Sequence, residues 1–491
     1  LAFLEPEIIA VDDAALEKFY GEKPELDKYK IYITEIRRGR EHSLSPELEK
    51  LLAGTNELAD LPYEGFATLG NADLKFPEIT NEKGEKIQIT NGRFVPLEES
   101  KDRRVRKEVF EKYYETFGSF KNTWATLYAG QVKQLMFYAR ARKYSSTLEA
   151  AVDGNNVSPA VYKNLVEAVN DNLDKMHRYV SLRKKLLELD ELHMYDIYVP
   201  IVKDYDAKYT IEEAKELVLK AVEPLGTNYV NLIKKAFAER WIDVVENEGK
   251  RNGAYSSGVY GVHPFVLLNF NGTLDNVFTL AHEMGHAMHS YFSNEAQNFL
   301  DSRYRIFVAE VASTTNEVLL MEYMLKNAKD NKERAYLLNH YMDSFKGTVF
   351  RQTMFAEFEK TSNEMAERGE PLTHENLTEL YLNLNKKYYG EAMISDDLIG
   401  YEWMRIPHFY YNFYVYQYAT GFSAAVAIAN RVLKEGETAV SDYMKFLSSG
   451  CTKDPVSLLR IAGVDMATKE PINSALQVFE RVIEEMEELT K

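Results

Sequence analysis

His282 and His286 stand four residues apart, and Glu283 directly follows the first of them. Four residues make slightly more than one helical turn, so on a helix both imidazoles project from one face, about 6 Å apart, and can bind a single metal ion. Glu283 then lies beside this ion without binding it, where it can take a proton from a zinc-bound water. Such residues at this spacing are typical of a zinc-dependent hydrolase; the alternative is two histidines that only cap or pack a helix.

The residues before His282 predict the helix that positions both histidines. Asn269 to Gly272 indicates a turn, and Thr273 is a suitable N-cap. Asp275 either accepts a hydrogen bond from His282 or only stabilises the helix dipole in the first turn, and we favour the second interpretation. An apolar stripe predicts that the helix is buried, and it comprises Leu274, Val277, Phe278, Leu280, Ala281, Met284, Gly285 and Met288.

A catalytic zinc site usually has three protein ligands and one position for water, so a third ligand must come from elsewhere in the chain. Residues 293–298 predict a polar break, after which a second helical pattern runs from Phe307 to Leu319. Glu310 lies inside this pattern, 24 residues after His286, and Glu317 follows two turns later on a similar face. On periodicity alone we favour Glu310 as the ligand, with Glu317 as the alternative or as a hydrogen-bond partner of a ligand.

Residues 408–418 form a second unusual group, because six of them carry a histidine or tyrosine ring. Hydrolysis of an amide creates an oxyanion, which a tyrosine hydroxyl or an imidazole N–H can stabilise. The spacing of Tyr411, Tyr414 and Tyr418 predicts one face of a helix. From the residues alone, packing in the core is the favoured interpretation of such an aromatic stripe.

Two segments around the candidate ligands closely resemble oligoendopeptidase F, of the thimet oligopeptidase family. They are AHEMGHAMHSY from Ala281 and IFVAEVASTTNE from Ile306. Three further segments are similar to the same family, namely RRGREHSLSPELEKLLA from Arg37, YSSGVYGVHPFVLLNFNGT from Tyr255 and HFYYNFYVYQYATG from His408. The resemblance therefore covers nearly the whole chain.

The resemblance implies a role for each candidate residue. Glu283 would activate the water, beside one zinc ion bound by His282, His286 and Glu310. Residues of the 408–418 group would contact the substrate carbonyl, although their tyrosine spacing differs from that of the better known thimet branch. Among them we rank His408, Tyr411, Tyr414 and Tyr418 above Tyr410 and Tyr416.

The segment from Tyr255 to Thr273 contains small residues that predict a loop, followed by a strand from Phe265 to Phe270 beside the zinc helix. The edge of such a strand can bind an extended peptide through main-chain hydrogen bonds. Because the resemblance implies that this segment lines the cleft, we favour substrate binding over a purely structural hairpin.

The composition excludes several classes of protein. The chain has 491 residues and a net charge of −17, so nucleic acid and anionic membrane surfaces are not expected partners. Cys451 is the only cysteine, which excludes an internal disulfide and suits a reducing cytoplasm. The sequence has no apolar run long enough to span a membrane, and its first residues do not match a signal peptide.

The overall pattern predicts a mainly α protein, with long amphipathic stretches at Lys101 to Arg142 and Ser158 to Leu189. A hairpin is expected around the Lys83-Gly84 turn, with a strand from Lys86 to Thr90. We therefore divide the chain into an N-terminal helical segment, residues 1–78, and a catalytic domain, residues 79–491. The resemblance implies a two-lobed helical zincin-type peptidase, with a deep substrate channel and a small β-sheet beside the zinc helix.

These observations predict a cytoplasmic zinc endopeptidase that hydrolyses internal bonds of short unstructured peptides. A carboxypeptidase or dipeptidyl carboxypeptidase on the same scaffold is the first alternative, and it would need a basic group to bind the terminal carboxylate. A peptide-binding protein without catalysis is the second alternative, which the intact set of Glu283 and the three candidate ligands disfavours.

Overall fold

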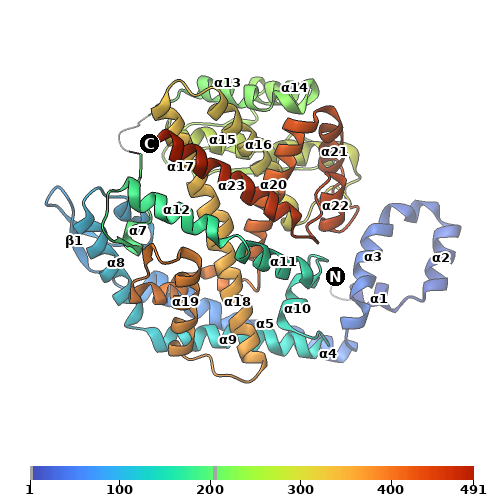
Figure 1. Cartoon of the computed structure of the whole chain (residues 1–491). Coiled ribbons are helices and arrows are strands. Elements are labelled where there is room, and N and C mark those ends of the chain that lie inside the picture. Colours follow the sequence, from blue (N-terminus) through green and yellow to red (C-terminus); the bar gives the residue numbers. More distant parts are fainter. Residues whose placement is uncertain (1–3, 203–206) are drawn as a thin grey trace.

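The computed structural model describes residues 4–202 and 207–491, and helices dominate this part of the chain (Figure 1). Residues 1–3 lie outside the described residues. They belong to the first residues of the chain, which are not expected from the sequence to form a signal peptide. The prediction of a mainly α protein is confirmed, with only three small sheets in the described ranges. None of the described helices is both long and apolar enough to cross a membrane.

The N-terminal residues form short helices, of which α1 to α3 project to one side of the body in Figure 1. Ion pairs join Arg38 to Asp153 and Glu35 to Arg305, and they tie α3 to the body. The bounds are α1 (Leu4–Ala10), α2 (Asp13–Glu22), α3 (Lys30–Arg38), α4 (Pro46–Ala53), α5 (Asn56–Ala59) and α6 (Leu61–Thr68). Helix α6 packs against α9, so the domain boundary after residue 78 stays a prediction.

The two amphipathic stretches each form two helices instead of one. The breaks fall at residues 119–120 and 171–172. Both helices of each pair contribute buried side chains to the same core, so the apolar pattern is present on both sides of each break. The hairpin prediction is confirmed, since β1 (Glu78–Thr80) pairs antiparallel with β2 (Lys86–Gln88). The helices that follow are α7 (Asn91–Glu98), α8 (Arg103–Gly118), α9 (Lys121–Ala141), α10 (Thr147–Asp153), α11 (Pro159–Asn170) and α12 (Leu173–Leu186).

A small sheet lies beside α15, as predicted. Its strand order is β4-β6-β5, with β4 (Ile242–Asp243) parallel and β5 (Tyr255–Ser257) antiparallel to β6 (Phe265–Leu267). Strand β6 is shorter than predicted, although backbone hydrogen bonds from Leu268 and Phe270 continue the alignment with the β4 segment. Helices α13 (Ile211–Ala221) and α14 (Thr227–Ala238) precede the sheet, and both contact α15.

Helix α15 (Leu274–Ala296) begins where the sequence predicts. The Thr273 side chain accepts a hydrogen bond from Asn276 N–H, and the Asn276 side chain accepts from Thr273 N–H in return. The predicted break at residues 293–298 is wrong at its start, because the helix continues to Ala296. Ser293 is tolerated inside it since its buried hydroxyl donates to the carbonyl of Ser302 at 2.5 Å.

The C-terminal half surrounds α16 (Ile306–Lys326), which packs on both α15 and α20 (Tyr416–Glu435). In Figure 1 these three helices lie in the upper part of the molecule, together with α21 (Glu437–Leu447) and α22 (Pro455–Ile461). Strand β7 (Met393–Ile394) pairs parallel with β3 (Leu192–His193). The remaining helices are α17 (Asn331–Phe345), α18 (Arg351–Glu367), α19 (His374–Tyr389) and α23 (Glu470–Leu489).

The contact between α15 and α16 is a backbone-to-backbone approach at Gly285. A Cβ atom placed on this residue would lie 2.5 Å from Ser313 Cα and 2.6 Å from the carbonyl oxygen of Ala312. Neither of these atoms can move alone, because both belong to the main chain of a buried helix. Glycine at residue 285 therefore sets the spacing between the helix that carries the two histidines and the helix that carries Glu310.

We predict that Gly285→Ala separates the two helices. Overpacking of this kind costs about 1–3 kcal/mol, and the displacement of α16 should weaken metal binding at least tenfold. Thermal unfolding and bound metal per chain measure the two effects. Gly347→Ala is the matched control, since no atom lies within 4 Å of a Cβ placed there. A Gly285→Ala protein with normal Tm and metal content would contradict this account of the contact.

Candidate metal centre

The structure brings His282, His286 and Glu310 together, from two different helices. The Glu310 Oε2 atom lies 3.3 Å from His282 Nε2 and 3.4 Å from His286 Nε2. All three ligand atoms lie within 4.8 Å of one another, and among the described residues this is the only such group of histidine, cysteine and acidic side chains. The spacing within α15 aligns the two imidazoles, while the α15–α16 contact supplies the carboxylate.

The two distances from Glu310 to the imidazole nitrogens fit a tetrahedral metal ion. A zinc site has Zn–N and Zn–O bonds of about 2.0–2.2 Å, and a tetrahedron with such bonds has edges of about 3.3–3.6 Å. The two observed N–O distances, 3.3 and 3.4 Å, fall in this range. Two imidazoles and one carboxylate are also a donor set that catalytic zinc sites use. The residues present therefore fit the group that the sequence predicts.

Glu317 contacts the other ring nitrogen of His282, so the two candidate acids occupy different positions. His282 Nδ1 forms a hydrogen bond with Glu317 Oε1, and this bond directs Nε2 of the same ring towards Glu310. Asp275 does not take this role: its nearest ionisable partner in the described residues is His340, at 3.7 Å. The dipole interpretation of Asp275 that we favoured is thus consistent with its position in the first turn of α15.

The charges around the site favour a cation. Burial by itself lowers the pKa of His282, but hydrogen bonds to Glu310 and Glu317 outweigh it and raise the pKa to about 10. Burial likewise raises the pKa of Glu310, and hydrogen bonds from His282 and His286 outweigh it and hold the pKa well below its usual range. Two carboxylates therefore stabilise a positive charge at these imidazoles, which a bound metal ion would supply.

Glu283 is buried next to this group and is not one of the clustered donors. Its side chain is 5% exposed, and its Oε2 atom has no hydrogen-bond partner among the described residues. Burial raises its pKa, against the opposing effect of His282 and His286. A carboxyl group with a free oxygen can accept a proton and return it, and a raised pKa makes it a stronger base.

The four higher-ranked residues of the 408–418 group also gather at one place. His408 Nε2 lies 3.3 Å from the Tyr418 hydroxyl, and the rings of Tyr414 and Tyr418 are 5.5 Å apart. Tyr411 joins them with its ring 5.7 Å from that of His408. Tyr418 lies in α20, which packs on α16, and burial, Tyr414 and then the charge of Glu310 raise its pKa, so this group borders the candidate metal centre.

The prediction that Tyr411, Tyr414 and Tyr418 share one helical face is wrong. Helix α20 begins only at Tyr416, and the chain before it turns through Asn412 and Phe413, both with a positive φ. This turn, instead of a helical repeat, brings the rings together. Tyr410 and Tyr416, which we ranked lower, are 7% and 1% exposed and pack in the core.

Tyr63 belongs to the same aromatic group, and sequence reasoning missed it. Its hydroxyl lies 3.3 Å from that of Tyr411, although 348 residues separate the two in the chain. No local pattern around Tyr63 distinguishes it from other tyrosines of the N-terminal segment. Because α6 contacts the short helix η8 (Pro407–Tyr410), only the packing of the N-terminal segment reveals this neighbour.

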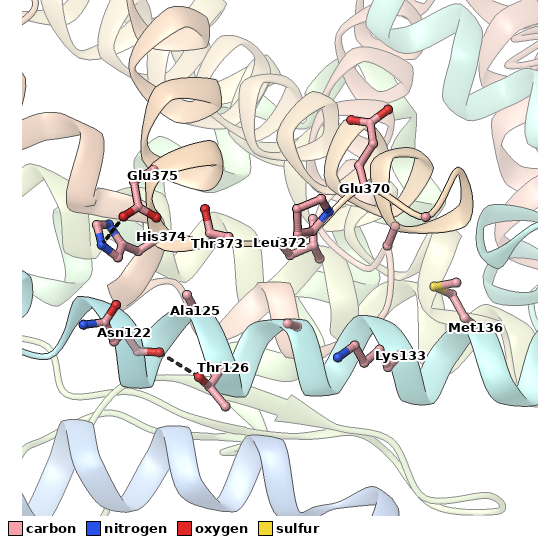
Figure 2. A pocket seen from close by; sticks show the side chains of 14 residues that line it. Asn122, Ala125, Thr126, Lys133, Met136, Glu370, Leu372, Thr373, His374 and Glu375 are labelled. Atoms are coloured by element: carbon pink, nitrogen blue, oxygen red, sulfur yellow. Dashed lines mark hydrogen bonds and ion pairs between the residues drawn. The ribbon is translucent and has the colours of Figure 1, made fainter.

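A separate cavity of about 640 Å³ lies between α9 and the segment that joins α18 to α19 (Figure 2). Lys133 and Met136 line it from α9, and Glu370 and His374 line it from the opposite side. His374 Nε2 pairs with Glu375 Oε1 at 2.8 Å. None of its lining residues comes from α15, α16 or α20, so this cavity is not part of the candidate metal centre.

Comparison with protein families agrees with the geometry of the site. The model of peptidase family M3 matches residues 96–478, and that of the oligopeptidase F N-terminal family matches residues 7–76. The chain belongs to peptidase family M3 and is a metalloendopeptidase.

Individual relatives support the same class. The chain is 51% identical over 488 residues to the oligopeptidase PepF of Bacillus subtilis. The matched region covers 99% of this chain and 73% of that protein. The crystal structure of oligoendopeptidase-F from Enterococcus faecium superimposes with a TM-score of 0.84 at 42% identity, covering 99% of this chain and 82% of that one. PZ peptidase A shares the fold, with a TM-score of 0.73 at 18% identity.

The two acids should differ when each is replaced by its amide. Glu310→Gln removes a candidate ligand and should release the metal under mild chelation. Glu317→Gln keeps an acceptor for His282 Nδ1 but removes its negative charge, so metal affinity should fall about 10- to 100-fold while saturating metal restores full occupancy. Competition with a chromogenic chelator measures both affinities.

Asp275→Asn is the control for loss of a nearby negative charge, and it should leave the affinity unchanged. If Glu317→Gln loses the metal and Glu310→Gln keeps it, Glu317 is the ligand.

Proposed function

We propose that this metalloendopeptidase holds one zinc ion with His282, His286 and Glu310 and hydrolyses internal bonds of short unstructured peptides. The observation that carries the proposal is the position of the Glu310 carboxylate, 3.3 and 3.4 Å from the Nε2 atoms of His282 and His286, with Glu317 at the other nitrogen of the His282 ring. A bound zinc ion would supply Lewis acidity, which acidifies a water molecule and polarises a peptide carbonyl.

Glu283 is the proposed general base. Its buried carboxyl has a free oxygen beside the donor cluster and a raised pKa, so it is suited to take a proton from the attacking water. The same group then returns the proton to the leaving amine.

His408 and Tyr418 are the proposed donors to the oxyanion, with Tyr411 and Tyr414 beside them. Burial lowers the pKa of His408, so its ring is neutral at pH 7 and carries one N–H. Burial raises the pKa of Tyr418, so its hydroxyl stays protonated. Both groups can therefore donate a hydrogen bond to the carbonyl oxygen as negative charge develops on it.

The sheet beside α15 is the proposed binding surface for an extended substrate. The strand whose edge the sequence predicts to bind a peptide is β6, and this part of the prediction is wrong, because β6 is the central strand and pairs with β4 and β5. β5 is an outer strand of the same sheet, and main-chain hydrogen bonds along such an edge bind peptides with little regard to their sequence. Gly258 follows β5 and lies so close to α15 that a Cβ there would be 2.8 Å from Ser290 Cβ. Location in the cytoplasm is part of the proposal, and it rests on the single cysteine, Cys451.

Glu283→Gln separates metal binding from catalysis. The amide cannot accept the proton, so turnover should fall at least 1000-fold while the protein keeps one metal ion per chain. Metal analysis and cleavage of a quenched peptide on the same preparation test both points. Substantial peptidase activity in the variant would remove Glu283 from the mechanism.

Replacing His408 or Tyr418 by Phe deletes a donor and keeps most of the shape. If these groups act on the oxyanion, kcat and kcat/KM should fall together by about 10- to 1000-fold, with metal content unchanged. Tyr416→Phe is the control, because its hydroxyl is buried in the core and has no partner among the described residues. Wild-type kinetics in both site variants would indicate that these side chains only pack in the core.

A peptide blocked at both ends distinguishes an endopeptidase from an exopeptidase on the same scaffold. We expect internal cleavage of blocked, unstructured peptides of about 5 to 20 residues and none of a folded protein, since the substrate binds as an extended chain. An enzyme that binds a terminal carboxylate would lose most of its activity on the blocked peptide. Strict dependence on a free end, or efficient digestion of a native protein, would contradict the proposed substrate class.

A further inference from the structure

The turn between η8 and α20 has an unusual backbone. Asn412 and Phe413 are consecutive and have φ angles of 51° and 58°, in the left-handed region that residues other than glycine rarely adopt. Phenylalanine has no side-chain oxygen or nitrogen that could stabilise this conformation locally. Such a conformation persists only where the surrounding structure holds it, and it is frequent where function depends on the geometry.

A buried carboxyl group on a neighbouring helix accepts a hydrogen bond from this turn. Phe413 N–H donates to Glu359 Oε1 at 2.6 Å, and Glu359 belongs to α18. Glu359 is 1% exposed, and its other oxygen has no hydrogen-bond partner among the described residues. No salt bridge in the described part of the chain neutralises it, so its only polar side-chain contact is with the turn.

A second side chain holds the turn from another helix. Gln131 of α9 donates from Nε2 to Asn412 Oδ1 at 2.9 Å and to the carbonyl oxygen of Tyr410 at 3.4 Å. The Phe413 ring is buried against Tyr162, with 5.6 Å between the ring centroids. The backbone is thus held on both sides of the peptide that links Asn412 to Phe413.

The turn decides where two tyrosines of the proposed oxyanion group lie. Tyr411 directly precedes it and Tyr414 directly follows it, and their rings meet at 6.3 Å and an angle of 87°. Both rings also contact His408, at 5.7 Å for Tyr411 and 6.4 Å for Tyr414. An extended backbone at residues 412–413 would carry these side chains apart.

We propose that Glu359 is a positioning residue for peptide hydrolysis, whose carboxyl holds the Asn412–Phe413 turn so that Tyr411 and Tyr414 stand beside His408 and Tyr418. It does not touch the substrate, because it is buried beneath the turn. This role rests on the proposed function of the tyrosine group. Burial raises the pKa of Glu359 to about 8, against the effect of the Phe413 N–H, so the carboxyl is mainly neutral at pH 7 and glutamine resembles it closely.

The test compares Glu359→Gln with Glu359→Leu. Glutamine keeps an acceptor for Phe413 N–H, so kcat should stay within about twofold of wild type. Leucine removes the acceptor and frees the turn, so kcat should fall about 10- to 100-fold with little change in KM or metal content. Equal kcat in the leucine variant and the wild type would overturn the proposal.

Glu357→Leu is the matched control on the same helix. Glu357 accepts hydrogen bonds from Asn170 and Tyr388 and does not contact the turn. Its replacement should lower Tm without lowering kcat. A loss of kcat equal to that of Glu359→Leu would assign the effect to general damage of α18 and overturn the positioning role.

A double-mutant comparison separates this role from the proposed function itself. In a protein that already carries Tyr411→Phe and Tyr414→Phe, Glu359→Leu should cost less than twofold, because the hydroxyls that it positions are gone. An undiminished cost would show that Glu359 acts elsewhere. If the tyrosine double variant and His408→Phe both have wild-type kinetics, the tyrosine group does not act in catalysis. The positioning role of Glu359 is then overturned together with that proposed function.

If Glu359→Leu does not fold, Gln131→Met tests the same turn from its other side. This variant deletes the bonds to Asn412 and Tyr410 and keeps the volume of the side chain. We expect kcat to fall about threefold or more with normal metal content. A folded Gln131→Met protein with wild-type kcat would overturn the inference that the turn is held for catalysis.

Discussion

The approach of α15 to α16 at Gly285 is the constraint on which the candidate site depends. A Cβ at this residue would overlap main-chain atoms of Ser313 and Ala312, so only glycine allows the two helices to lie so close. The approach brings a carboxylate from one helix within 3.4 Å of two imidazoles on the other. Side chains on separate helices can share one ion only if the helix spacing is held to a fraction of an ångström, and a backbone contact does this more rigidly than side-chain packing.

The second requirement of the site is negative charge in a partly buried place. The His282 imidazole loses solvation on burial, which disfavours its positive form. Glu310 and Glu317 reverse this preference at His282, one at each ring nitrogen. The two carboxylates carry a negative charge that a divalent cation would neutralise. This accounts for two acids on one face of α16 that both contact His282.

The tyrosine group is assembled from parts of the chain that are distant in sequence. Tyr63 comes from α6, the turn at residues 412–413 is held from α9 and α18, and Tyr418 comes from the first turn of α20. The group thus depends on several elements outside the α15–α16 pair. The candidate metal centre and the proposed carbonyl contacts therefore come from different parts of one core, so we expect that mutations can affect one without the other.

Features that depend on short-range spacing could be predicted from the sequence. Two histidines four residues apart share a helical face and Thr273 caps the helix, because local geometry is set by the backbone repeat. Glu310 is favoured as the third ligand by the resemblance of its motif to the family. The folded structure was needed to show which nitrogen of His282 faces which acid, and that Glu317 contacts Nδ1 of this ring. It also replaced the predicted helical face of tyrosines with a strained turn and added Tyr63 and Glu359. Such neighbours arise from packing between distant segments, and no periodicity along the chain encodes them.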